Sequence, residues 1–221
     1  MEKKLLNKPI LYNYFRSSTS VRVRIALNLK GIDYKYAALH LRKGEHQTTE
    51  YLKINPYGLL PTIEFPSGII LNQSLAILEY LDEIYPTPSI FPVNALEKAK
   101  VRSMAYAIAI EIHPLNNLHV LNYLKDDLAL DDLGVKNWFS KWVHKAFLPF
   151  ESVLQKDKDT GSYCFGNTPT VVDICLFAQV VNNARFEVDM TKYPKINSIY
   201  QTCLSNKAFY EALPKNQPDA E

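Results

Sequence analysis

Four consecutive hydroxyl side chains occupy positions 17–20, where a predicted strand gives way to a predicted helix. The strand is the apolar run 10–15, and apolar residues at helical spacing indicate the helix over 17–30. A helix N-terminus suits an anion because it carries unpaired N–H groups and the positive end of the helix dipole. No acidic residue interrupts the cluster, and Arg16 precedes it. One hydroxyl would serve as a cap, but four exceed that need. We therefore predict a site that holds a bound negative charge.

A second helix N-terminus in the same half of the chain also begins with hydrogen-bonding side chains. Gln73 and Ser74 open an amphipathic helix over 73–85, and they indicate a second anion site, the alternative being a simple cap. Between the two sites lies Leu60-Pro61, at the start of a predicted strand. A cis bond there would expose the backbone of Leu60 to a peptide ligand, whereas the trans state is the far commoner one.

Other chemistries fit the residues less well. A serine nucleophile needs a base and an oxyanion hole, and the chain has no G-x-S-x-G elbow. His113 and His119 are six residues apart, so they do not form the i, i+4 pair that shares one helix face, and we predict no metal site. The chain also has no glycine-rich phosphate loop.

The composition is that of a globular protein. The 221 residues are 47% hydrophobic and carry a net charge of +2 without runs of basic residues, so we expect neither nucleic acid nor a membrane as a partner. The first eight residues lack the apolar stretch of a signal peptide, and no segment approaches the ~20 apolar residues of a membrane span. Three cysteines without C-x-x-C spacing fit a reduced, cytoplasmic protein.

The elements that must position the hydroxyl cluster alternate between strands and helices. We predict strands over 10–15, 34–39, 60–65 and 69–71, and helices over 17–30, 47–54 and 73–85. Pro66-Ser67-Gly68 indicates a hairpin turn between the last two strands. This β-α-β-α-β-β-α order is the thioredoxin-like arrangement, whose first two strands are joined by a helical crossover.

Beyond the proline-rich break at 86–94 the sequence predicts helices alone. These cover 95–112, 131–154 and 170–183. The last is apolar nearly all round and is therefore expected to be buried, and Thr170 with Asp173 comes close to a capping box at its start. Pro114 should end or kink the first. The predicted fold class is α+β, with a thioredoxin-like domain over 1–86, a linker over 87–94 and an all-helical domain over 95–221.

In these motifs the sequence resembles the zeta class of the glutathione transferases, over nearly the whole chain. The hydroxyl cluster with the arginines that follow it, 17–27, is quite specific for the class, whereas Gln73-Ser74 and the box from Thr170 to Asp173 occur across the superfamily. Further matching segments are Asn55-Pro56, Leu60-Pro61-Thr62, and Asn183 to Phe186. The resemblance implies the glutathione transferase fold, glutathione as cofactor and a homodimer.

The resemblance also implies roles for individual residues. It places the glutathione sulfur near Ser17, Ser18 and Thr19. It pairs the cysteinyl backbone of glutathione with Leu60, in the Leu60-Pro61 pair. It places the γ-glutamyl end of glutathione at Gln73 and Ser74. Residues at or near positions that the family uses around glutathione or the neighbouring subunit are His46, His113, Asn117 and His119. Where the family commonly has a cysteine this chain has Thr19, which can still donate a hydrogen bond to sulfur. Val21 replaces a bulky aromatic, which changes pocket shape rather than chemistry.

Glutathione would supply the negative charge that the hydroxyl cluster lacks. Its thiol has a pKa near the ~8.5 of free cysteine, and lowering that pKa by about two units needs ~2.7 kcal/mol of preference for the thiolate. A helix dipole contributes typically about 0.3–1 kcal/mol, and a hydroxyl bonded to the charged sulfur about 1.5–3 kcal/mol. Neither the helix dipole nor a single hydroxyl comfortably supplies this preference for the thiolate alone. Hydroxyls at a helix N-terminus combine the two contributions.

The activity that the resemblance implies is glutathione-dependent cis-trans isomerisation of maleylacetoacetate to fumarylacetoacetate, in tyrosine and phenylalanine catabolism. The thiolate adds to the maleyl double bond, the resulting single bond rotates, and elimination leaves the trans isomer without consuming glutathione. A dicarboxylic keto-acid substrate calls for planar bidentate donors, for which Arg16 and Arg185 are the candidates. The alternative for Arg185 is a surface ion pair with Glu187 or Asp189.

Other functions stay open at this point. The same thiolate and arginines would serve a maleylpyruvate isomerase or a general zeta-class transferase acting on α-halo acids. A non-catalytic scaffold of the same fold is a further alternative, which the presence of Ser17 and Arg185 disfavours. Arg22 and Arg24, within the predicted helix, are expected to form structural ion pairs.

Overall fold

The computed structural model of the chain describes residues 8–221, which divide into two compact units. The first unit joins the described part of Met1–Ser89 to Lys207–Glu221, and the second is Ile90–Asn206. The last fifteen or so residues thus belong with the N-terminal sheet and not with the helices that precede them. The boundaries at 86 and 94 that the sequence suggests stay a prediction.

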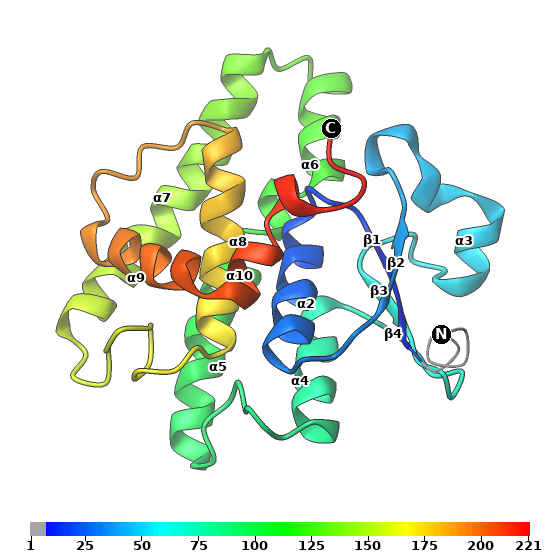
Figure 1. Cartoon of the computed structure of the whole chain (residues 1–221). Coiled ribbons are helices and arrows are strands. Elements are labelled where there is room, and N and C mark those ends of the chain that lie inside the picture. The colour runs from blue at the N-terminus through cyan, green and yellow to red at the C-terminus, as the bar shows by residue number, and fades with distance from the viewer. Residues whose placement is uncertain (1–7) are drawn as a thin grey trace. The chain divides into compact units, whose positions relative to one another are not determined.

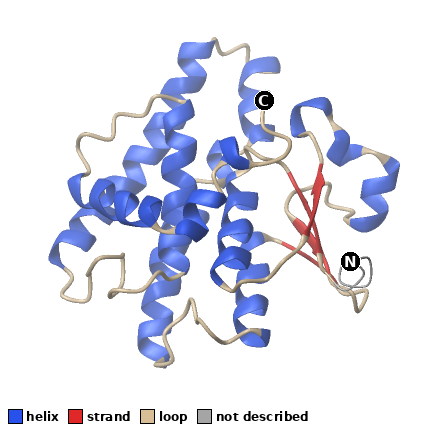
Figure 2. Ribbon diagram, viewed as in Figure 1, coloured by secondary structure: helices blue, strands red, loops and turns tan. Residues whose placement is uncertain are grey.

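The first unit is built on a four-stranded sheet (Figure 2). Its elements are β1 (Ile10–Asn13), α2 (Ser18–Leu29), β2 (Lys35–Ala38), α3 (Thr49–Ile54), β3 (Thr62–Glu64), β4 (Ile70–Asn72), α4 (Ser74–Ile84) and α10 (Lys207–Glu211). The strand order is β2-β1-β3-β4, with β1 and β2 parallel and the other pairs antiparallel. Because two parallel neighbours need a crossover connection, α2 links β1 to β2. The predicted thioredoxin-like order is confirmed.

The sheet is covered by helices on both faces, α2 and α4 on one and α3 on the other (Figure 1). Leu11 in β1 and Ile63 in β3, which stand opposite each other, are fully buried. The predicted turn at Pro66-Ser67-Gly68 joins β3 to β4, and Gly68 adopts a φ of 83°, a conformation that glycine takes without strain. The helix α2 is buried almost all round, which makes it the central helix of this unit.

The second unit consists of helices. They are α5 (Ala95–Ala109), α6 (Leu118–Asp126), α7 (Asp132–Lys156), α8 (Val171–Arg185) and α9 (Pro194–Ser205), with a 3₁₀ turn at Pro114–Asn116. The expected buried helix is α8, and its capping box of Thr170 and Asp173 is present. Pro114 opens the 3₁₀ turn after α5 has ended, as a proline that cannot continue a helix should. The predicted α+β fold class, with a helical C-terminal part, is confirmed.

Three helices of the structure were not predicted: α6, α9 and α10. They are short or begin without a strong local cap. The N-terminus of α9 is instead satisfied from a distance, since the buried carboxylate of Glu151 in α7 accepts from the backbone N–H of Lys195 (2.8 Å) and Ile196 (2.9 Å). Local sequence carries no sign of such a tertiary cap.

Within residues 8–221, no helix combines the length and the apolar character needed to cross a bilayer. In the same part of the chain, no three histidine, cysteine, aspartate or glutamate side chains gather into a group that could hold a metal ion.

Candidate functional site

The hydroxyl cluster lies where the sequence suggests, at the junction of β1 and α2. Ser17 is the N-cap of α2, and its Oγ accepts a hydrogen bond from the backbone N–H of Ser20 at 3.2 Å. Ser18 is the first residue of the helix and is buried. The first turn of α2 contains no acidic residue. The N-terminal N–H groups and the positive dipole end of this helix are therefore not matched by a carboxylate within its own first turn.

Hydroxyl groups connect this helix start to Leu60. The Oγ of Ser17 and the Oγ1 of Thr19 are 2.8 Å apart, and the Thr19 hydroxyl donates to the carbonyl oxygen of Leu60 at 3.0 Å. A hydroxyl has one hydrogen to donate, so Ser17 is the donor in its bond with Thr19. The Leu60–Pro61 peptide bond is cis. The structure thus brings Ser17, Thr19 and Leu60 into one chain of hydrogen bonds, with the hydrogen of Ser17 directed to Thr19.

The start of α4 provides the second polar helix N-terminus. Gln73 is exposed and has a φ of 66°, in the left-handed region that side chains other than glycine rarely adopt, and strain of this kind clusters at functional sites. The buried Oγ of Ser74 accepts from Nη1 of Arg22 at 3.3 Å. The first turn of α4 also lacks an acidic residue. The two helix starts that the sequence singles out share this feature.

His46 lies in a 3₁₀ turn, Glu45–Gln47, of the same unit. Its ring is partly buried, and its Nδ1 has no hydrogen-bond partner within residues 8–221. Burial lowers the pKa of His46, because the protein interior disfavours the charged ring. The ring is therefore neutral near pH 7 and has one nitrogen available to a ligand.

Arg16 stands directly before the hydroxyl cluster. Its guanidinium lies 4.7 Å from the centroid of the Phe15 ring, and Nη2 is 4.0 Å from a carboxylate oxygen of Glu221. Both side chains of this ion pair retain exposure to solvent, so the pair is weak. Arg16 is therefore accessible for a carboxylate that binds next to Ser17.

Arg24 corrects one expectation from the sequence. It is fully buried and forms no ion pair within residues 8–221, contrary to the prediction. Its guanidinium donates to Oδ1 of Asn13 and to the carbonyl oxygens of Tyr14, Phe15 and Ala212. Carbonyl and amide oxygens thus take the place of a carboxylate, because each stabilises a buried cation by accepting from it.

The remaining predicted residues lie in the helical unit. Nε2 of His113 is 3.4 Å from Nδ2 of Asn117, the N-cap of α6, and His119 is exposed in the first turn of that helix. The guanidinium of Arg185, at the end of α8, is exposed; it donates to Oδ1 of Asn182 at 3.1 Å and lies 5.6 Å from the centroid of the Phe186 ring. These residues keep their predicted roles as predictions.

The acids considered as alternative partners of Arg185 have contacts of their own. Glu187 forms an ion pair with Lys136, and Asp189 accepts hydrogen bonds from the backbone and hydroxyl of Thr191. Their charges are thus at least partly committed to other groups.

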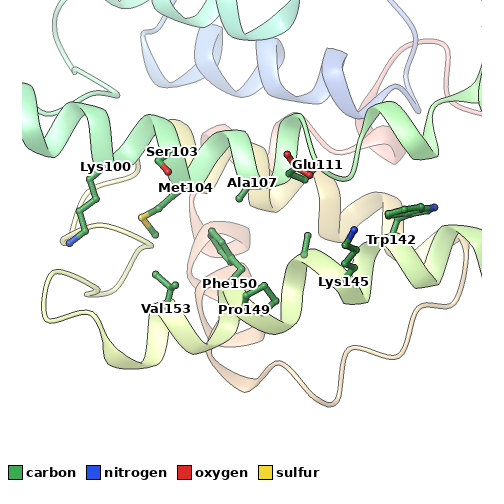
Figure 3. Close-up of a pocket in the computed structure, with 11 residues that line it drawn as sticks. Lys100, Ser103, Met104, Ala107, Glu111, Trp142, Lys145, Pro149, Phe150 and Val153 are labelled. Atoms are coloured by element: carbon green, nitrogen blue, oxygen red, sulfur yellow. The ribbon is translucent and has the colours of Figure 1, made fainter.

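The helical unit also contains a cavity of about 470 Å³ between α5 and α7 (Figure 3). Met104 and Phe150 give it an apolar wall, while Lys145 and Glu111 supply charges. None of the residues that the sequence singles out lines this cavity.

Sequence reasoning missed part of the support behind Ser17. Asp219 accepts from the backbone N–H of Phe15 at 3.1 Å and from the hydroxyl of Tyr36. No sequence pattern around Asp219 predicts its contact with Phe15, which lies 204 residues away in the chain. The polar contacts of Arg24 could have been expected from the sequence, because a charged residue in a buried, otherwise apolar helix needs polar partners.

The sequence of this chain matches two protein-family models and is similar to proteins of known name. Residues 16–84 match the family described as "Glutathione S-transferase, N-terminal domain", and residues 117–213 match "Glutathione S-transferase, C-terminal domain". A probable maleylacetoacetate isomerase of Vibrio cholerae is 43% identical over 213 residues, which cover 96% of this chain and 98% of that protein. A maleylpyruvate isomerase of Ralstonia sp. is 41% identical over 210 residues, covering 95% of this chain and 99% of that protein.

Solved structures agree with the sequence relatives. One described as the holo structure of maleyl pyruvate isomerase, a bacterial glutathione S-transferase in the zeta class, has a TM-score of 0.94 and 41% identity, covering 96% of this chain and 100% of that one. A maleylacetoacetate isomerase from Methylobacterium extorquens AM1, solved with bound malonate and GSH, has a TM-score of 0.92 and 32% identity, covering 96% and 99%.

Proposed function

Because the chain belongs to the glutathione transferase family, in its zeta class, we propose that it is a glutathione-dependent isomerase that converts maleylacetoacetate to fumarylacetoacetate. The observation that carries the proposal is the cluster of hydroxyls at the acid-free start of α2, hydrogen-bonded to Leu60. The Ser17 hydroxyl can donate a hydrogen bond to a thiolate, and it is linked through Thr19 to the backbone of Leu60, which can pair with a peptide. Glutathione is a peptide that carries a thiol.

The residues of the first unit fit glutathione. The tripeptide carries carboxylates and an ionisable thiol, and α2 and α4 both begin without an acidic residue that would repel them. The buried, unpartnered Nδ1 of His46 and the exposed, strained Gln73 are further groups that a ligand could engage. We assign the sulfur to Ser17, Ser18 and Thr19. The peptide and γ-glutamyl parts are assigned to Leu60 with Pro61 and to Gln73 with Ser74.

Bound glutathione supplies a thiolate that adds to the maleyl double bond and is released after rotation. The role of this chain is to keep the sulfur ionised. Ser17 can direct its hydrogen to the sulfur in place of Thr19, since both are acceptors for the same hydroxyl. Such a bond to a charged atom is worth about 1.5–3 kcal/mol, and the helix N-terminus adds about 0.3–1 kcal/mol. Together these match the ~2.7 kcal/mol that a thiol pKa lowered by about two units requires.

We assign the carboxylates of the dicarboxylic substrate to Arg16 and Arg185. Both have exposure to solvent, and a guanidinium presents two parallel donors to a carboxylate. His113, Asn117 and His119 are proposed to contribute around glutathione or the neighbouring subunit.

Maleylpyruvate is the alternative substrate. A relative with this named activity is 41% identical to the chain, and a solved structure of that description has the TM-score of 0.94. Both substrates carry a maleyl group and the same negative charges, so the hydroxyl cluster serves either. A general zeta-class transferase acting on α-halo acids, and a scaffold without activity, are the other candidates.

An assay of the purified protein with each cis acid, with and without glutathione, tests the proposal. We expect conversion of maleylacetoacetate to the trans isomer at a rate that saturates with glutathione, while total glutathione stays constant. Loss of glutathione in proportion to substrate, without trans product, would support the transferase instead. A folded protein without either activity would support the scaffold.

We further propose a homodimer that acts in the cytoplasm, in tyrosine and phenylalanine catabolism. Exposed apolar side chains of α7, such as Leu148 (65% exposed) and Val153, support a partner surface on the helical unit. The three cysteines form no disulfide within residues 8–221, which suits a reducing compartment. Sedimentation equilibrium should give twice the mass of the 25.3 kDa chain; a monomer at micromolar concentration would contradict the dimer.

A further inference from the structure

The loop that presents Ser17 is held by residues far away in the sequence. This loop, residues 14–17, joins β1 to α2, and the C-terminal segment, residues 207–221, belongs to the same unit. Figure 1 shows the segment in red, with α10 beside α2 and the following residues passing near the end of β1. Two side chains, one from α2 and one from the segment, bind the backbone of the loop.

The first of these is Arg24. It donates to Oδ1 of Asn13 at 2.8 Å and to the carbonyl oxygen of Phe15 at 2.8 Å, and it reaches the carbonyl oxygen of Ala212 at 3.1 Å. Burial lowers the pKa of Arg24, whereas the neighbouring Tyr36, Tyr34 and Asp219 raise it. One buried guanidinium therefore ties the loop to the C-terminal segment.

The second is Asp219. One carboxylate oxygen accepts from the backbone N–H of Phe15 at 3.1 Å, and the other accepts from the hydroxyl of Tyr36 in β2. Phe15 lies beyond the last residue of β1, so its N–H has no place in the sheet ladder. Asp219 thus satisfies a buried donor of the loop that the sheet does not reach.

The C-terminal segment is itself anchored, so Asp219 is not a loose end. Nδ2 of Asn28 in α2 donates to the carbonyl oxygen of Ala208 at 2.9 Å. Nε2 of the buried Gln217 donates to the carbonyl oxygens of Glu211 (2.7 Å) and Leu213 (2.8 Å), which closes the turn before Asp219.

The held loop leads directly into the hydroxyl cluster. The backbone N–H of Ser17 donates to the carbonyl oxygen of Tyr14 at 3.0 Å, and that oxygen also accepts from Arg24 at 3.3 Å. We propose that Asp219 is a positioning residue for the thiol site: with Arg24 it fixes the backbone of residues 14 and 15 and thereby the direction of the Ser17 hydroxyl. This inference rests on the proposed role of Ser17 toward glutathione and adds the C-terminal segment to that site.

The test compares Asp219→Ala with Ser17→Ala and with the double variant. The ultraviolet absorbance of the thiolate, followed against pH in the complex with glutathione, gives the pKa of the bound thiol. We expect Asp219→Ala to raise it by roughly one unit, a tenfold loss of thiolate at pH values below the pKa. In the Ser17→Ala background the same change should add less than about 0.3 unit, because residues that act through one group are not additive.

A second readout needs no glutathione. Amide hydrogen exchange of residues 14–17 in the unliganded protein should accelerate in Asp219→Ala, since the loop loses one of its two restraints. Asp219→Asn keeps one acceptor oxygen and should lie between Asp219→Ala and the parent in both measurements. Glu211→Gln is the matched control in the same segment; its exposed carboxylate lies 3.7 Å from Lys207, and we expect no change.

The outcomes separate this inference from the proposed function. If Ser17→Ala raises the thiol pKa and Asp219→Ala does not, Asp219 is not a positioning residue. If Ser17→Ala itself leaves the pKa of the bound thiol unchanged, the proposed role of Ser17 toward glutathione is wrong, and with it the basis for the role of Asp219. Should Asp219→Ala not fold, Tyr36→Phe removes only one bond to Asp219. It should shift the pKa in the same direction by less, and the absence of a shift in both Tyr36→Phe and Asp219→Asn would overturn the inference.

Discussion

Two helices of this protein, α2 and α8, begin with a hydroxyl N-cap and use their N-termini in opposite ways. At α8 the chain supplies its own carboxylate: Asp173 is fully buried and accepts from the backbone N–H groups of Thr170 (2.8 Å) and Cys164 (2.7 Å) and from the Thr170 hydroxyl. At α2 the cap is Ser17 alone, and the first turn has no acid. The N-terminus of α8 is thus matched by a carboxylate of the chain itself, whereas the first turn of α2 contains no such group, which fits the proposed role of α2 toward a charged ligand.

Thiols show the same contrast. Cys164 lies beside the α8 N-terminus, yet burial, and then the nearby charge of Asp173, raise the pKa of its thiol. Loss of hydration therefore outweighs any help from the helix dipole. A thiol held at α2 would meet the partly exposed hydroxyls of Ser17 and Thr19 and no carboxylate in the first turn of the helix. Access to solvent and the lack of a nearby carboxylate thus distinguish the helix start that we propose to ionise a thiol from the one beside Cys164.

The largest effect is expected from removing the acid that closes α8. Asp173→Ala should lower the free energy of unfolding by roughly 3 kcal/mol or more, because a cap is lost and buried N–H groups lose their acceptor. Urea denaturation measures this. Asp131→Ala, which removes the exposed N-cap of α7, is the control and should cost about 1 kcal/mol. Equal losses would mean that burial of the α8 cap adds nothing.

Ser17→Ala should act on the ligand more than on the fold. Losing a hydroxyl donor to a charged sulfur costs about 1.5–3 kcal/mol, which raises the pKa of bound glutathione by roughly one to two units. The loss of the cap should cost no more than about 1 kcal/mol of stability. Thiolate absorbance against pH and urea denaturation give the two values. An unchanged thiol pKa would remove Ser17 from the site and make Ser18 the next candidate.

The other end of α8 carries Arg185, and Arg185→Lys tests whether it grips a substrate carboxylate. The charge is kept but the planar fork is lost, so substrate binding should weaken by about 1–3 kcal/mol. Glutathione affinity, measured by calorimetry, should hardly move. Equal losses in both affinities would mark Arg185 as structural.

Thr19→Val tests the hydroxyl chain with a side chain of similar shape. The bond to the Leu60 carbonyl is lost, which should cost about 1 kcal/mol of stability. Ser17 then loses an internal acceptor but keeps its hydrogen for the sulfur, so the thiol pKa should change by less than about half a unit. A shift as large as that of Ser17→Ala would show that Thr19 is itself a main donor to the sulfur.

The smallest effect is expected at the cysteines. All three are buried, and burial raises the pKa of the Cys164 and Cys203 thiols, so both stay protonated at neutral pH. Thiol reagents should therefore label the folded protein slowly and the urea-unfolded protein fully. Rapid labelling of the native chain would contradict the buried, inert state of the helical unit.

The local chemistry of helices and strands was predictable from the sequence. The hydroxyl start of α2, the polar start of α4 and the capping box of α8 all lie where their residues indicate, because a cap and the turn that it closes are neighbours in the chain. Helix α9 was missed because its cap, Glu151, comes from another helix.

The sequence by itself determined the order of the strands and helices from β1 to α4, the two acid-free helix starts and the resemblance to a glutathione-binding family, since each depends on residue types at short spacing. Only the tertiary structure decided that the Leu60-Pro61 bond is cis, that Thr19 turns its hydroxyl to Leu60, and that Arg24 binds carbonyl oxygens where an ion pair was expected. It alone brought Asp219 to Phe15. These contacts join segments that local spacing cannot relate, because a buried polar group takes whichever partner the folded chain places within its reach.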